Sequence, residues 1–190
     1  MSRRIDEERA LRSETTEFPI LETLRAEGPH PSHRDKLKLF GQFVGVWDLD
    51  VLFYDENGKI VYHQPGEWSF AYILDGRAIQ DVLVYPNQED GLQNSPGRRR
   101  IGTTLRFYDS KQDIWQMIWL GAVSGTIVVR TGKQVGEEIW IEGLDSSRNL
   151  TRSIFTEIGP DRFQWKDVLS QDGGRTWRME QEMLARRRLT

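Results

Sequence analysis

The chain has 190 residues, enough for one domain, and its 29 acidic and 26 basic side chains give a net charge of −3. This balance provides no positive field for phosphates, so no nucleic-acid partner is expected. The absence of cysteine excludes disulfides, thiolate catalysis and cysteine-bound zinc, and it favours a cytoplasmic location. No apolar run is as long as a membrane span, and the charged residues 1–12 do not form a signal peptide, so no membrane partner is expected.

The N-terminal residues differ in composition from the rest of the chain. Residues 1–24 are charged and weakly helical, and the helix-breaking segment 27–31 follows them with two prolines and a glycine. We therefore predict an arm over residues 1–31 and a single domain over residues 32–190. Such an arm could act as a lid, or it could make a homodimer contact, and both alternatives stay open.

A short helix is predicted over residues 33–43, followed by a change of hydrophobic period. Ser32 is the predicted N-cap, and apolar residues follow it at helical spacing. From Gly45 the period is two, as in a strand with one buried face. This first strand ends at the dipeptide Asn57-Gly58, which favours a tight hairpin turn.

About ten strands are predicted, and most are joined by turns of hairpin length. They cover residues 45–54, 60–74, 77–85, 101–108, 113–120, 126–132, 135–142, 150–158, 162–170 and 175–185. Short turns make neighbours in sequence pair antiparallel, and closing the sheet removes its exposed edges. We therefore predict an all-β fold, a single antiparallel up-and-down β-barrel with a short N-terminal helix.

Two motifs resemble known families of such barrels. The segment Phe43-Val44-Gly45-Val46-Trp47 resembles the Gly-x-Trp motif that opens lipocalins and other calycins. That resemblance implies that Trp47 plugs the closed end of the barrel and that an arginine after the last strand packs over its ring, with Arg186, Arg187 and Arg188 as the choices.

A second resemblance is closer and covers about residues 37–186. The segments Gly45-Val46-Trp47, Leu74-Asp75-Gly76-Arg77 and 170–177 together resemble a family of uncharacterised bacterial calycin-like barrels. This family implies a fold and no settled activity. The segment 170–177 also matches the Asp-box hairpin once, and we expect Gly174 to take a positive φ angle there.

Aromatic residues gather on single faces of several predicted strands. If those faces point inward, the interior is an aromatic cup, and the alternative is a filled core without a cavity. The expected lining residues are Trp68, Tyr72, Trp115, Trp119 and Trp165. The leading function is therefore binding of a small hydrophobic or aromatic molecule, with no cofactor required.

Charged residues also occur in phase with apolar ones. Asp81, Arg106 and Arg152 are predicted to be ligand anchors, with Arg152 paired to Asp81 or Asp167, unless these faces lie outside. The alternative function is a cofactor-independent isomerase, cyclase or hydratase. In that enzyme Asp81, Asp167 or His63 would be the acid or base, and an arginine would stabilise an anion.

No metal or haem site is predicted. The opening motif at Gly45 differs from the longer Gly-Trp-Gly motif of haem-binding barrels, and His30 and His33 alone do not form a metal site. The longest connection, residues 86–100, and the arm before Ser32 are expected near the open end of the barrel or at a subunit interface, where they would control access to the cavity. A third possibility is an interaction module that works through the arm.

Overall fold

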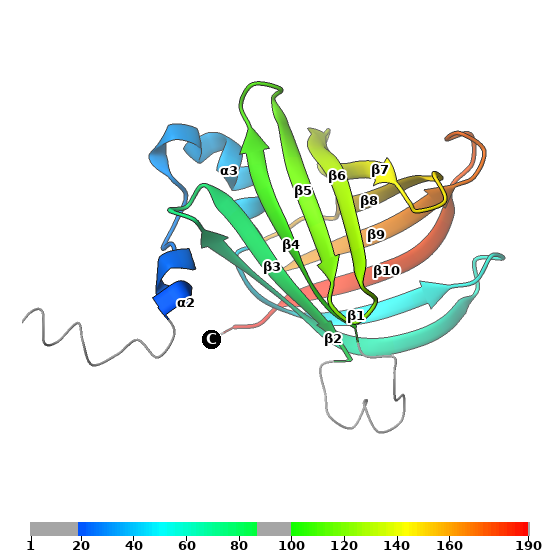
Figure 1. Cartoon of the computed structure of the whole chain (residues 1–190). Helices are drawn as coiled ribbons and strands as arrows, with labels where there is room; N and C mark the ends of the chain where they lie inside the picture. The colour runs from blue at the N-terminus through cyan, green and yellow to red at the C-terminus, as the bar shows by residue number, and fades with distance from the viewer. Residues whose placement is uncertain (1–18, 87–99, 190) are drawn as a thin grey trace, which may run out of the picture.

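A computed structural model describes residues 19–86 and 100–189, and it shows a closed antiparallel barrel of ten strands with short helices at one end (Figure 1). Each strand pairs with its neighbours in sequence, and β1 also pairs with β10 to close the sheet. The prediction of an all-β fold with a single antiparallel up-and-down barrel is confirmed. No helix within the described ranges is long and apolar enough to cross a membrane.

The elements follow the predicted order closely. The helical segments are α2 (Pro19–Leu24), the 3-10 turn η1 (Pro31–His33) and α3 (Arg34–Gly41). The strands are β1 (Gly45–Tyr54), β2 (Ile60–Ile73), β3 (Ala78–Tyr85), β4 (Arg100–Asp109), β5 (Ile114–Gly121), β6 (Thr126–Val135), β7 (Glu138–Leu144), β8 (Leu150–Thr156), β9 (Arg162–Ser170) and β10 (Arg178–Arg187).

Alternation along β1 shows why the sheet has an inner and an outer face. Trp47, Leu49 and Val51 are buried, whereas Asp48 and Asp50 between them are exposed. A period of two places successive side chains on opposite faces of the sheet, so the apolar set fills the barrel. The register with β10 runs from Trp47 opposite Arg187 to Phe53 opposite Gln181.

Helix α3 closes one end of the barrel. Its Leu37 and Phe40 are buried, and the Phe40 ring lies 4.8 Å from that of Trp115 and 6.0 Å from that of Phe155. Phe43, just after the helix, continues this cluster with its ring 4.8 Å from that of Phe163. The aromatic core at this end is therefore solid and joins the helix to opposite walls of the barrel.

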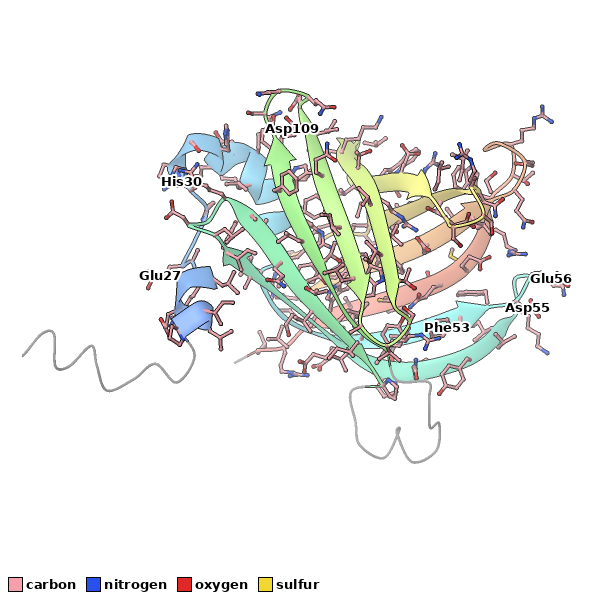
Figure 2. All side chains as sticks on the ribbon, in the orientation of Figure 1. Glu27, His30, Phe53, Asp55, Glu56 and Asp109 are labelled. Carbon is pink, nitrogen blue, oxygen red and sulfur yellow. The ribbon has the colours of Figure 1, made fainter. Side chains whose placement is uncertain are left out.

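The two rims of the barrel are distinct. Figure 2 shows Asp109, at the β4–β5 turn, on the rim that carries α3, whereas Asp55 and Glu56, at the β1–β2 turn, lie at the far rim. Because antiparallel strands alternate in direction, the last residue of β3 and the first residue of β4 also belong to the far rim. The predicted access loop falls on residues 87–99, which lie outside the described residues.

The helix begins differently from the sequence prediction. His33 precedes α3 and makes no side-chain cap, so the predicted N-cap at Ser32 is wrong. Pro31 starts a separate 3-10 turn, and the His30 side chain accepts a hydrogen bond from the Ser32 N–H at 3.2 Å. The fixed φ of a proline suits the first residue of a helical turn, so Pro31 begins the 3-10 turn. Helix α3 therefore starts only at Arg34.

The described part of the predicted arm pairs with the β2–β3 turn. The Leu24 carbonyl accepts from the Leu74 N–H at 3.1 Å, and the His30 N–H donates to the Gly76 carbonyl at 3.0 Å. Gly76 has φ +71°, and a Cβ there would lie 2.1 Å from the Gly28 carbonyl oxygen, so only glycine fits this close approach. A homodimer through the arm, residues 1–31, stays a prediction, and residues 1–18 of that arm lie outside the described residues.

Candidate functional site

The barrel contains a cavity of about 240 Å³ toward the rim away from α3. Trp68, Trp119 and Trp165 line it, together with apolar side chains such as Leu83 and Ile141. The remaining lining residues are Tyr85, Thr104, Arg106, Met117, Thr126, Val128, Arg130, Ser153, Asp167, Gln181 and Met183. The aromatic core beside α3 thus forms the floor, and the walls come from most of the strands.

The tryptophans line the cavity from three different strands. Trp68 is 3% exposed, and its ring stands perpendicular to that of Trp165 at 6.0 Å between centroids. The ring of Trp119 has space because β4 carries Gly102 beside it, where a Cβ would lie 2.3 Å from Trp119 Cη2. Such an arrangement suits a flat or apolar ligand that contacts ring faces and edges.

A buried ion pair lies at the base of one wall. Arg106 on β4 bonds through Nη1 to Asp81 on β3, and both side chains are almost fully buried. The Thr104 N–H also donates to Asp81, at 3.2 Å. The guanidinium packs over the rings of Phe40 and Phe70 at 5.3 and 5.4 Å. A buried charge needs a partner of this kind, because desolvating it alone would be very unfavourable.

A second charged cluster begins two strands away, on β6. Arg130 Nη1 on β6 donates to Ser153 Oγ at 2.6 Å and to Asp167 Oδ1 at 3.0 Å. Ser153 Oγ donates in turn to Asp167 Oδ1 at 2.6 Å. These side chains come from β6, β8 and β9, so the cluster spans one wall of the barrel.

Sequence reasoning missed Arg130 as a site residue. Both faces of β6 carry apolar residues, since the outward Ile127 and Val129 are 70% and 63% exposed. The alternation therefore did not show which face points inward. The available signal was the spacing of Arg130 from Val128 and Gly132, which places all three on one face of the strand.

Several buried donors in this region have no hydrogen-bond partner among the described residues. They include Trp68 Nε1, Arg106 Nε and Arg130 Nε, all in residues that line the cavity. The unpartnered acceptor Gln64 Oε1 belongs to a residue outside the lining. Buried polar groups are normally paired, so unpartnered donors in residues that line the cavity are exceptional.

Burial also fixes the protonation of one lining residue. Tyr85 is 7% exposed, and desolvation raises the pKa of its phenol above the ordinary value. Tyr85 therefore stays neutral at physiological pH. It offers the cavity a hydroxyl group without an added charge.

The structure places the predicted ligand residues other than Arg152 in three positions. Trp68, Trp119, Trp165 and Arg106 lie in the cavity wall. Trp115 and Tyr72 do not, because Trp115 packs on Phe40 below the cavity and the Tyr72 hydroxyl lies against Gly41 of α3. Asp81 is also outside the lining and acts behind Arg106 as its counter-ion.

The predicted inward placement of Arg152 is wrong. Arg152 lies on the outer face of β8, where it bonds Glu142 at 2.8 Å and stacks on Trp140 and Trp177 at 3.9 and 4.3 Å. Its neighbours Ser153 and Thr151 are buried instead, which sets the inner face of this strand. The predicted pairing of Arg152 with Asp81 or Asp167 is also wrong, because those carboxylates pair with Arg106 and Arg130.

His63 does not reach the cavity either. It is exposed on the outer face of β2, and its Nε2 lies 3.4 Å from Asp50 Oδ1. Of the proposed acids and bases, only Asp167 lines the cavity. Across the described ranges, no group of three or more histidine, cysteine, aspartate or glutamate side chains is arranged to hold a metal ion.

Comparison with known proteins supports the fold. No family model and no curated protein sequence matches the chain. Among solved structures, the S-type phycobiliprotein lyase of Guillardia theta is similar, with a TM-score of 0.54 and 9% sequence identity. The match covers 80% of this chain and 92% of that chain. At this identity the similarity concerns the calycin-like barrel fold alone.

Proposed function

We propose that the protein binds one small, mainly aromatic or hydrophobic molecule inside its barrel. The observation that carries the proposal is the cavity of about 240 Å³ between Trp68, Trp119 and Trp165. Cavities for drug-sized ligands are usually larger, about 300–1,000 Å³. We therefore expect a ligand with one or two rings.

The structural neighbour suggests one further ligand to test. Its name describes a phycobiliprotein lyase, which makes a bilin a reasonable probe for a barrel of similar fold. A four-ring bilin is large relative to a cavity of about 240 Å³, so we expect a smaller ring system to bind more tightly. The fold supports the idea of an enclosed ligand, and the cavity size guides its class.

An enzymatic role depends on a single observation, the carboxylate of Asp167 in the cavity wall. Asp167 already accepts hydrogen bonds from Arg130 and Ser153, so it is engaged by the protein. A cofactor-independent isomerase, cyclase or hydratase would need this carboxylate as its base. Binding does not require Asp167 to leave its hydrogen bonds with Arg130 and Ser153, and it is the function we favour.

The binding proposal can be tested by calorimetry with indole, a neutral two-ring probe. We expect a Kd below about 1 mM for the wild type, since apolar burial drives such binding. Val128 lines the cavity, whereas its neighbour Val129 is 63% exposed on the outer face. Val128→Trp should fill the cavity and abolish binding, and Val129→Trp is the matched control that should retain it.

Two results would overturn the proposal. One is the absence of heat from indole and from any other one- or two-ring probe in the wild type. The other is equal binding by Val128→Trp and Val129→Trp, both shown by circular dichroism to be folded. Either would mean that the cavity does not hold the ligand.

A further inference from the structure

We infer that the ligand carries a carboxylate group, held between Arg106 and Arg130. This inference rests on the proposed function and specifies the ligand class as a small aryl carboxylate. The two arginines come from β4 and β6, on either side of β5, and both line the cavity.

Strand register places the two arginines in one row across the sheet. Arg106 lies opposite Met117 on β5, and Met117 lies opposite Arg130 on β6. Since neighbouring strands are about 4.7–4.9 Å apart, the Cα atoms of the arginines are roughly 10 Å apart. Both side chains point inward over Met117. A carboxylate between them can bridge the distance, with one oxygen bound to each arginine.

Each arginine is held from its far side by an aspartate of the protein. Asp81 contacts Arg106 through Nη1, and Asp167 contacts Arg130 through Nη1. A guanidinium has further N–H donors beyond the one used, and the Nε of each has no partner among the described residues. The aspartates therefore fix the two side chains and leave donors for a ligand.

Trp68 adds a third donor to this set. Its Nε1–H is buried and has no partner within the described part of the chain, and an indole can only donate. An ionised carboxylate only accepts, and its two oxygens offer more acceptor positions than a carbonyl or an ether. A group of donors without a matching acceptor is thus best satisfied by a carboxylate.

Both arginines offer a ligand charged donors. Among the described residues, the charged side chains of the lining are Arg106, Arg130 and Asp167, and Asp81 balances Arg106 from outside the lining. Hydrogen bonds from charged donors in a largely desolvated site are stronger than those between neutral groups.

The remainder of the lining selects the other end of the ligand. Trp68 and Trp165 present perpendicular rings, and Trp119 lies toward the far rim beside Gly102. An aromatic ring fits between such faces and edges. A molecule with one or two rings and one carboxylate therefore satisfies both the apolar and the polar part of the cavity.

The test compares naphthalene-2-carboxylate with its neutral isostere naphthalene-2-carboxamide by calorimetry. We expect the wild type to bind the carboxylate at least about tenfold more tightly, in line with charge-assisted hydrogen bonds. Arg130→Gln, shown by circular dichroism to be folded, should bring the two affinities to within about threefold of each other. Arg152→Gln is the matched control, because it breaks an ion pair on the outer face and should keep the preference.

The outcomes separate the inference from the proposed function. If indole binds but the wild type does not prefer the carboxylate, the inference is wrong and the binding proposal stands. If neither naphthalene compound nor indole binds, both are wrong. The wild-type comparison decides the question even if Arg130→Gln does not fold. A preference that survives in folded Arg130→Gln would also overturn the assignment.

Discussion

Trp47 connects three separate parts of the closed end of the barrel. It is fully buried, and its Nε1 donates to the Phe43 carbonyl at 2.7 Å. Arg187 packs over the ring at 4.1 Å and also donates to the Val44 carbonyl at 2.7 Å. The resemblance to calycins implied one of three arginines for this contact, and the structure identifies Arg187. This residue pair joins β1, β10 and the chain that leaves α3.

We expect Trp47→Ala to lower the free energy of unfolding by about 3–5 kcal/mol, the usual effect of truncating a buried aromatic residue. The measurement is urea unfolding followed by circular dichroism. Trp177→Ala serves as the control, because Trp177 is only partly buried in the β9–β10 hairpin and should have a smaller effect. Equal losses in the two variants would contradict the role of Trp47 as the plug.

At the scale of elements, a carboxylate caps the turn of the β9–β10 hairpin. Asp172 Oδ1 accepts from the N–H groups of Arg175 and Thr176, both at 2.9 Å, and Ser170 Oγ donates to it at 2.8 Å. Gly173 and Gly174 have φ angles of +76° and +90°, so the predicted positive φ of Gly174 is confirmed. Polar side chains that cap their own turn fix the register of the strands on either side.

This hairpin should make stability depend on pH at the acid end. The hydrogen bonds from Thr176 are the largest cause that lowers the pKa of Asp172 to about 2, from 3.8. A lowered pKa means that the stabilisation is complete above pH 3.8 and is lost as the pH falls toward 2. We expect Asp172→Asn to have a lower Tm than the wild type at pH 6, and the difference to shrink by pH 3.

Thermal unfolding at pH 6, 4 and 3 measures this difference directly. Glu137→Gln is the control, since Glu137 is an exposed carboxylate in the β6–β7 turn. Its Tm should follow that of the wild type at each pH. A constant gap between Asp172→Asn and the wild type across this range would show that the charge of Asp172 does not stabilise the turn.

Local patterns predict the strands well but not always their inner faces. Turn dipeptides and alternation are local signals, so the ten strands and their order follow from the sequence. The inner face of β8 does not follow from the sequence, because Leu150 and Ile154 suggest one inner face and Phe155 suggests the other. Only closure of the barrel buries Phe155 and leaves Arg152 outside.

The partners of the buried charges are likewise a property of the assembled sheet. The alternation shows that Asp81 is in phase with apolar neighbours, which indicates burial. Its partner Arg106 comes from the next strand, β4. The partner of Asp167 is Arg130, which comes from β6. A single sequence contains no signal for this choice, because it depends on strand register and on the curvature of the closed sheet.

At the scale of the whole molecule, the barrel and α3 share one core. Phe40 and Phe43 of the helical end contact Phe155 on β8 with ring centroids 6.0 and 4.7 Å apart. The closing pair of strands, β1 and β10, joins residues from opposite ends of the sequence. Neither the helix nor the last strand can leave without opening this core, which favours unfolding as a single unit.

We therefore expect urea unfolding to give coincident transitions by far-ultraviolet circular dichroism, which reports on the strands, and by tryptophan fluorescence, which reports on the core. Phe40→Ala should shift both curves to lower urea together, by about 3–5 kcal/mol of unfolding free energy, because its ring packs on Trp115 and Phe155. Lys38→Ala, on the exposed side of α3, is the control and should move neither. If Phe40→Ala separated the two transitions, α3 would be an independent lid on a barrel that folds without it. The closed end would then not be the fixed floor on which the cavity depends.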